Sequence, residues 1–145
     1  MNLYFLSANV PFAKTISPNE ITPYPFIKNV SSYQKEAKTL EEFYEHLIHH
    51  ATLGHCILKG QLNAPLCDEP RAGTTESSTP TEWIVFDTDY TGVESAEEFI
   101  SYLPASFSTT SYIEQISATA FIDDRGYKAH LFFLLNTPTP PIKIK

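Results

Sequence analysis

The order of apolar and polar positions first indicates a helix. Apolar residues recur at intervals of three and four over residues 39–52, which is the period of an amphipathic helix. Thr39 and, three residues later, Glu42 form a capping box at its start, and Gly54 follows as a stop signal. The residues expected on its buried face are Leu40, Phe43, Tyr44, Leu47, Ile48 and Ala51.

A second capping box, Ser95 with Glu98, predicts a shorter helix that ends at Leu103. Stretches with the apolar content of strands lie between turn-forming residues. These predicted strands are residues 55–58, 82–88, 111–119 and 127–135, of which the last two are expected to form a hairpin. The order helix, strand, strand, helix, strand, strand predicts an α+β fold with a mixed, mainly antiparallel sheet and flanking helices.

Three further segments lack this periodicity. Residues 1–37 contain several prolines with aromatic residues between them, which predicts an extended arm lying on the domain. Residues 60–81 are rich in Pro, Ser, Thr and Gly and predict a long loop. Residues 138–145, which are proline-rich at their start, are expected to be a linker or a truncated edge, so that residues 38–137 are the predicted domain.

The composition indicates a globular protein, with 42% hydrophobic residues in a chain of 145. No apolar run approaches the roughly 20 residues of a membrane span, and the N-terminus lacks the features of a signal peptide. A cytoplasmic location without membrane contact, and two free cysteines, are therefore expected. The net charge of −7 argues against a broad nucleic-acid-coating surface but allows a carboxylate site whose charge bound metal offsets.

Two aspartates close the predicted strand over residues 82–88. Because side chains alternate across a strand, Asp87 and Asp89 share a face, with Cα atoms about 6.6 Å apart. Carboxylates at this spacing repel one another unless a cation lies between them, and Mg²⁺ or Mn²⁺ is the common one. Asp87 and Asp89 are therefore candidate metal ligands, the alternative being an ordinary polar turn after a strand.

Cationic side chains gather at the start of the last predicted strand. Lys128 and His130 share a face there, and Arg125 precedes them in the loop, so that the three are candidates for holding a phosphate. Ser117, on the preceding predicted strand, offers a hydroxyl donor. The alternative for the histidine is a side chain satisfied at a sheet edge.

The first predicted helix also carries histidines. His46 and His50 are four residues apart, a spacing that can hold zinc, and His49 is offset from them. No glutamate follows His46 as a metalloprotease helix would require, and the two cysteines lack zinc-finger spacing. A solvated polar helix face is the favoured interpretation.

The ordered combination of these motifs resembles the archaeo-eukaryotic primase superfamily, and within it the primase-polymerase domains of phages, plasmids and other mobile genetic elements. The features are a strand ending in hydrophobic-Asp-x-Asp (TEWIVFDTD), a serine-containing strand (SYIEQISAT) and a strand carrying a histidine (YKAHLFFLL). Residues 54–73 also resemble the front end of phage primase-helicase proteins. The resemblance implies a partial primase-polymerase core with an RRM-like unit.

This resemblance implies metal-dependent nucleotidyl transfer by a DNA primase or polymerase in DNA replication. It implies that Asp87 and Asp89 bind Mg²⁺ or Mn²⁺ and that His130 contacts the phosphates of a nucleoside triphosphate. Single-stranded DNA would be the template, and a helicase or another replication protein a partner. The further residues expected to contact nucleotide, phosphate or template are Lys128, Arg125, Ser117, Lys59 and Arg71.

One motif of that family has no counterpart in this sequence. The family carries a third hydrophobic-Asp motif downstream of the histidine, whereas no aspartate or glutamate follows His130. One interpretation is the N-terminal segment of a longer or complemented enzyme. The alternative is a non-catalytic, truncated primase-fold protein that binds a replication partner or interferes with replication of a phage or mobile element. A third is an unrelated α+β domain with a surface aspartate turn.

Overall fold

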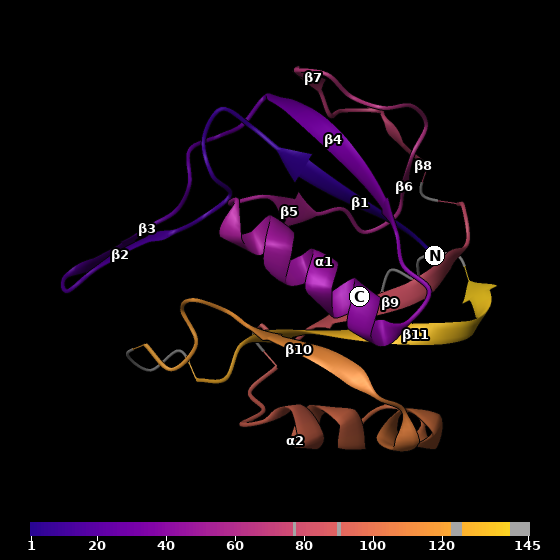
Figure 1. Ribbon diagram of the computed structural model, residues 1–145. Helices are drawn as coiled ribbons and strands as arrows, with labels where there is room; N and C mark the ends of the chain where they lie inside the picture. Colours follow the sequence, from indigo (N-terminus) through magenta and orange to yellow (C-terminus); the bar gives the residue numbers. More distant parts are fainter. Residues whose placement is uncertain (77, 90, 123–125, 140–145) are drawn as a thin grey trace. The chain divides into compact units, whose positions relative to one another are not determined.

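The computed structural model describes residues 1–76, 78–89, 91–122 and 126–139 (Figure 1). The described residues divide into two compact units: the first unit is Met1–Glu82 with Thr137–Thr139, and the second unit is Trp83–Asn136. The described elements are helices and mostly antiparallel strands, so the predicted α+β class is confirmed. No helix within the described ranges is both long and apolar enough to cross a membrane.

A four-stranded sheet in the order β5-β1-β4-β7 forms the first unit. β1 pairs with β4 in antiparallel register, from Asn2 opposite Glu36 to Ser7 opposite Ser31. Short strands in two further pairs, β2 with β3 and β6 with β8, complete the unit. The strands are β1 (Asn2–Ser7), β2 (Thr15–Ser17), β3 (Glu20–Thr22), β4 (Asn29–Glu36), β5 (Cys56–Ile57), β6 (Gln61–Leu62), β7 (Glu69–Pro70) and β8 (Thr75–Glu76).

The strands β1 to β4 lie in the segment for which the sequence predicted an extended arm. β4 reads NVSSYQKE, and Val30 is its only buried residue, so the strand lacks the alternation that marks a half-buried strand. Its pairing with β1 depends on backbone hydrogen bonds, which leave no sequence pattern. The loop predicted over residues 60–81 likewise contains the short strands β6, β7 and β8.

Helix α1 (Leu40–Thr52) begins at the predicted capping box. The Thr39 hydroxyl accepts a hydrogen bond from the Glu42 N–H at 3.2 Å, and the Glu42 carboxylate accepts one from the Lys38 N–H at 2.6 Å. The predicted buried face is wrong in part, because Tyr44 and Ile48 are nearly half exposed and Ala51 is exposed as well. The buried residues of α1 are Phe43, Leu47 and His50.

The second unit holds most of a sheet in the order β10-β11-β9, formed by β9 (Thr81–Asp87), β10 (Tyr112–Ile116) and β11 (Ala129–Thr139). The predicted hairpin is confirmed, since β10 and β11 pair in antiparallel register. Helix α2 (Ala96–Ser101) begins at the predicted cap, where the Ser95 hydroxyl accepts the Glu98 N–H. It packs on the sheet through a core of Phe86, Val93, Ala96, Ile100, Tyr127, Ala129, Leu131 and Phe133.

Candidate functional site

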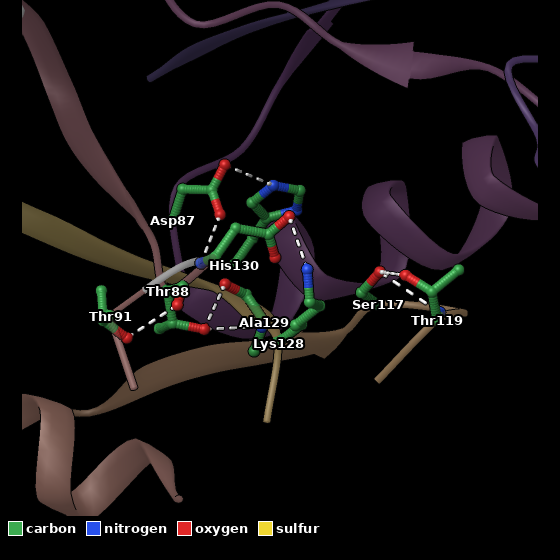
Figure 2. A network of polar contacts seen from close by, with 9 residues as sticks. Asp87, Thr88, Thr91, Ser117, Thr119, Lys128, Ala129 and His130 are labelled. Carbon is green, nitrogen blue, oxygen red and sulfur yellow. Dashed lines mark hydrogen bonds and ion pairs between the residues drawn. The ribbon is translucent and has the colours of Figure 1, made fainter. Parts of the chain in front are cut away.

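Two aspartates, a lysine and a histidine meet where β9 ends and β11 begins. Asp87 is the last residue of β9, and Asp89 follows two residues later. Lys128 directly precedes β11, and His130 is its second residue. Because β9 and β11 are neighbours in the sheet, the polar ends of the two strands lie together, as Figure 2 shows.

Each carboxylate of this site lies beside its own basic side chain. The Lys128 ammonium is 3.5 Å from Asp89 Oδ2. His130 Nε2 is 3.7 Å from Asp87 Oδ2, a contact that Figure 2 shows. The Lys128 side chain is only 9% exposed, whereas the Asp87 and His130 side chains are 46% and 41% exposed. The charge repulsion expected between the aspartates is therefore reduced by the Lys128 ammonium, and reduced further when His130 is protonated.

Thr88, between the two aspartates, points the other way and joins the strands. Its N–H donates to the Ala129 carbonyl at 3.0 Å, and its hydroxyl donates to the same carbonyl at 3.2 Å. The Ala129 N–H in turn donates to the Thr88 hydroxyl at 2.8 Å. Thr88 is fully buried, so the end of β9 has little freedom to slide along β11.

A local turn orients the aspartates further. The Asp89 N–H donates to Asp87 Oδ1 at 3.0 Å, which fixes the first carboxylate over the backbone of the turn. The Thr91 N–H and hydroxyl both donate to the Thr88 carbonyl, at 3.2 and 2.7 Å. Asp87 Oδ2 is the oxygen that lies toward His130.

Ser117 lies beside Lys128 across the β10–β11 hairpin, where its N–H donates to the Lys128 carbonyl at 2.8 Å. Its hydroxyl is 3.2 Å from the hydroxyl of Thr119, which is almost completely buried. The predicted donor is thus near the predicted phosphate-binding lysine, and its hydroxyl takes part in a local hydrogen bond with Thr119 (Figure 2).

Sequence reasoning missed two residues near the site. Thr88 carries a signal that could have identified it, since strand alternation places this polar residue on the core side of β9. Gln115 of β10 lies directly opposite His130 in the hairpin register and therefore shares its face. Gln115 could be found only once the register was known.

Three predicted residues remain, Arg125, Lys59 and Arg71. Arg125 lies outside the described residues. Lys59 and Arg71 are exposed residues of the first unit, where the positive charge of Arg71 lowers the pKa of Cys56 against the stronger, opposite effect of burial.

The donor chemistry of this site fits a hard divalent cation, because Asp87 and Asp89 both offer carboxylate oxygens open to solvent. The number of donors is small: in the described part of the chain, no group of three or more His, Cys, Asp or Glu side chains is placed to hold a metal ion. The remaining ligands of a cation would be phosphate oxygens and water. No protein-family model, no curated protein and no solved structure gives a significant match to this chain.

Proposed function

We propose that the second unit binds a nucleoside triphosphate together with Mg²⁺ or Mn²⁺, as the nucleotide site of a DNA primase or polymerase. The observation that supports the proposal is the meeting of Asp87 and Asp89 with Lys128 and His130 at the joined ends of two strands (Figure 2). Carboxylates bind hard cations through oxygen, and lysine and protonated histidine bind phosphate. The setting would be cytoplasmic DNA replication of a phage, plasmid or satellite, with a single-stranded template.

The two aspartates would hold the cation. Their side chains are 46% and 33% exposed, for Asp87 and Asp89, so that both accept a ligand from solvent. A bound divalent cation would offset the charge of the triphosphate and polarise the reacting phosphate. The turn hydrogen bond from the Asp89 N–H keeps the Asp87 carboxylate in place before any ligand arrives.

The two basic side chains would hold the phosphates. His130 is the more exposed of them, and we expect it to turn from Asp87 and donate its Nε2–H to a phosphate oxygen. Lys128 is largely buried and is held next to Asp89, so it would act as a fixed positive charge beside the phosphates. In this arrangement His130 exchanges Asp87 for a phosphate oxygen when the ligand binds, whereas Lys128 keeps its place beside Asp89.

The reaction that this arrangement serves best is nucleotidyl transfer. A primer hydroxyl oxygen would form a bond to the α-phosphorus while its proton passes to water, and the bond from that phosphorus to pyrophosphate would break. Lys128 and His130 would neutralise the charge of the leaving pyrophosphate. Because two carboxylates are few for such a centre, we propose that a further carboxylate comes from a partner protein such as a helicase, or from another part of a longer protein. We therefore expect this chain alone to bind the ligand and to incorporate nucleotides only when complemented.

A second candidate is a non-catalytic module that binds a replication protein or interferes with replication. It is favoured by the ion pairs themselves, because a site whose carboxylates already lie within 4 Å of basic groups needs no metal to be stable. In that case the same four side chains would present mixed charge to a protein partner.

Manganese titration followed by NMR separates the two candidates. Paramagnetic Mn²⁺ is expected to broaden the amide signals of Asp87, Asp89 and His130 first, and the Asp87→Asn variant to lose at least about tenfold in Mn²⁺ affinity. Asp68→Asn is the matched control, since Asp68 is an exposed aspartate of the first unit whose backbone conformation asparagine also adopts. Uniform broadening, or an equal loss of Mn²⁺ affinity in the control variant, would contradict the proposed metal site and favour the second candidate.

A nucleotide titration then tests the phosphate ligands. In the presence of Mn²⁺, a non-hydrolysable nucleoside triphosphate should bind the wild-type chain and bind the Lys128→Met variant at least about tenfold more weakly. Incorporation on a primed single-stranded template would be measured with and without added replication proteins. A folded chain that binds neither Mn²⁺ nor nucleotide contradicts the first candidate.

A further inference from the structure

Two pairs of stacked rings lie where α1 ends in the first unit. His50, in the last turn of α1, stacks on Phe5 of β1 with ring centroids 3.8 Å apart and planes 8° apart. His55, just before β5, stacks on Tyr33 of β4 with centroids 5.2 Å apart and planes 7° apart. The two imidazoles meet directly, with their Nδ1 atoms 2.9 Å apart.

This arrangement differs from the solvated helix face that the sequence favoured. His50 is only 2% exposed, so that prediction is wrong for this residue. His46, its possible zinc partner in the sequence, places Nε2 3.2 Å from the Glu36 carbonyl instead. The helix period could not reveal the actual partner, because His55 lies beyond the end of the helix.

The geometry fixes where the hydrogens lie. A contact between two Nδ1 atoms at 2.9 Å is a hydrogen bond only if one nitrogen is protonated and the other is not. His50 Nε2 is buried and has no hydrogen-bond partner among the described residues. If Nε2 of His50 is unprotonated, no unpaired N–H is buried. The hydrogen of His50 is therefore on Nδ1, and this Nδ1–H donates a hydrogen bond to His55 Nδ1.

Three segments of the first unit meet at the same place. The His55 N–H donates to the His50 carbonyl at 3.0 Å, and the Gly54 carbonyl between them accepts the Phe12 N–H at 2.7 Å. Gly54 has a φ of +70°, and a Cβ there would lie 2.5 Å from the Pro11 Cβ. The end of α1, the turn after it and Pro11–Phe12 therefore depend on one another.

A proton added to this pair has no favourable position. His50 Nδ1 is already protonated, His55 Nδ1 is occupied as acceptor, and a proton on His50 Nε2 would be a buried donor without a partner. Besides Tyr33, which stacks on His55, the groups whose charge acts on His50 are His55, His49, Lys35 and His46, and all four of these are basic. Uptake of a proton must therefore break the bond between the rings or place an unpaired N–H on the buried His50 Nε2.

We propose that the His50–His55 pair is an acid-released latch, which holds the end of α1 and Pro11–Phe12 on β1 and β4 while neutral and releases them when it takes up a proton. Metal binding by the pair is the competing interpretation, and in the described residues no third metal-ligating side chain joins it.

The direction of the pH effect follows from the two states. Burial, followed by the charges of His55 and the other basic groups, lowers the pKa of His50 to about 4 in the folded chain, from an ordinary value of 6.5. Burial also lowers the pKa of His55. The released state thus binds more protons below pH 6.5, so the latch is fully stabilising above that pH and is weakened progressively as the pH falls toward 4.

The hydrogen positions are tested on the wild-type chain by long-range ¹H–¹⁵N NMR of the imidazoles. At pH 7.5 we expect His50 to carry its hydrogen on Nδ1 and none on Nε2, and we expect the ring to stay neutral at pH 5.5. A His50 protonated on Nε2, or one that titrates near 6.5, would overturn the proposal. This measurement requires no substitution and therefore no assumption about the folding of a variant.

Release is tested by amide hydrogen exchange, corrected for the intrinsic effect of pH. Between pH 6.5 and 5, exchange of Phe12 and residues 53–58 should accelerate by up to about tenfold per pH unit, the limit for one proton, while β10 and β11 stay unchanged. His50→Phe keeps a ring on Phe5 and should abolish this acceleration, whereas His49→Gln, at the exposed neighbour, should retain it. Equal acceleration in His50→Phe, or protection by added Zn²⁺ that requires His50, would contradict the latch.

Discussion

Thr88 and Ala129 share three hydrogen bonds across the end of the β9–β11 pair. The aspartates flank Thr88 in sequence, and Lys128 and His130 flank Ala129. Because side chains alternate along a strand, fixing Thr88 to Ala129 brings both flanking pairs to the opposite face together. The register of one buried threonine thus determines which acid meets which base.

The Thr88→Val substitution tests this alignment. Valine has the shape of threonine but leaves the buried Ala129 N–H without its acceptor, so the free energy of unfolding should fall by about 1–3 kcal/mol. Urea denaturation measures the change. Thr109→Val, at an exposed hydroxyl, is the control and should stay within about 0.5 kcal/mol of wild type. Equal losses in the two variants would mean that the alignment does not depend on the Thr88 hydroxyl.

The Lys128–Asp89 ion pair should contribute to stability as well as to ligand binding. Lys128 is largely buried and Asp89 is one-third exposed, so solvent screens the pair only in part. Lys128→Met is expected to lower the free energy of unfolding by about 1–2 kcal/mol. A double-mutant cycle with Asp89→Asn should give a coupling of about 0.5–1 kcal/mol, and a coupling of zero would mean that the contact contributes nothing.

Predictions from the sequence were most reliable where local chemistry determines structure. The two helix starts, at Thr39 and Ser95, follow from a hydroxyl and a carboxylate three residues apart, and both caps form as expected. The β10–β11 hairpin was also confirmed, since its prediction rested on two stretches with the apolar content of strands that a turn signal separates. In contrast, β4 is a polar strand defined by its pairing with β1, which local sequence does not reveal.

The candidate site shows the same limit. Alternation correctly placed Lys128 and His130 on one face, with Ala129, Leu131 and Phe133 in the core on the other. Alternation could not show that β11 lies between β10 and β9. The contact of His130 with Asp87 therefore could not be predicted from the sequence. The partly buried His50–His55 bond likewise depends on the packing of α1 against β1, where His50 stacks on Phe5.

The contribution of each capping box to stability should be measurable separately in its own unit. Thr39→Ala removes the acceptor of the Glu42 N–H in the first unit, and Ser95→Ala removes that of the Glu98 N–H in the second. Each change should cost about 1 kcal/mol of stability, because a helix N–H loses its partner. Hydrogen exchange at Glu42 and Glu98 localises each effect. The conservative Thr39→Ser and Ser95→Thr variants keep the hydroxyl and should restore most of the stability.

The two cysteines should differ sharply in reactivity. Cys67 is exposed, whereas burial raises the pKa of the partly buried Cys56 thiol, with Arg71 opposing the rise. Since the thiolate is the reactive form, iodoacetamide at pH 8 should modify Cys67 at least about tenfold faster than Cys56, as mass spectrometry would record. The Arg71→Gln variant should slow Cys56 further, because its thiolate loses a nearby positive charge. In urea the two rates should converge, and a difference that persists there would show that the folded environment is not its cause.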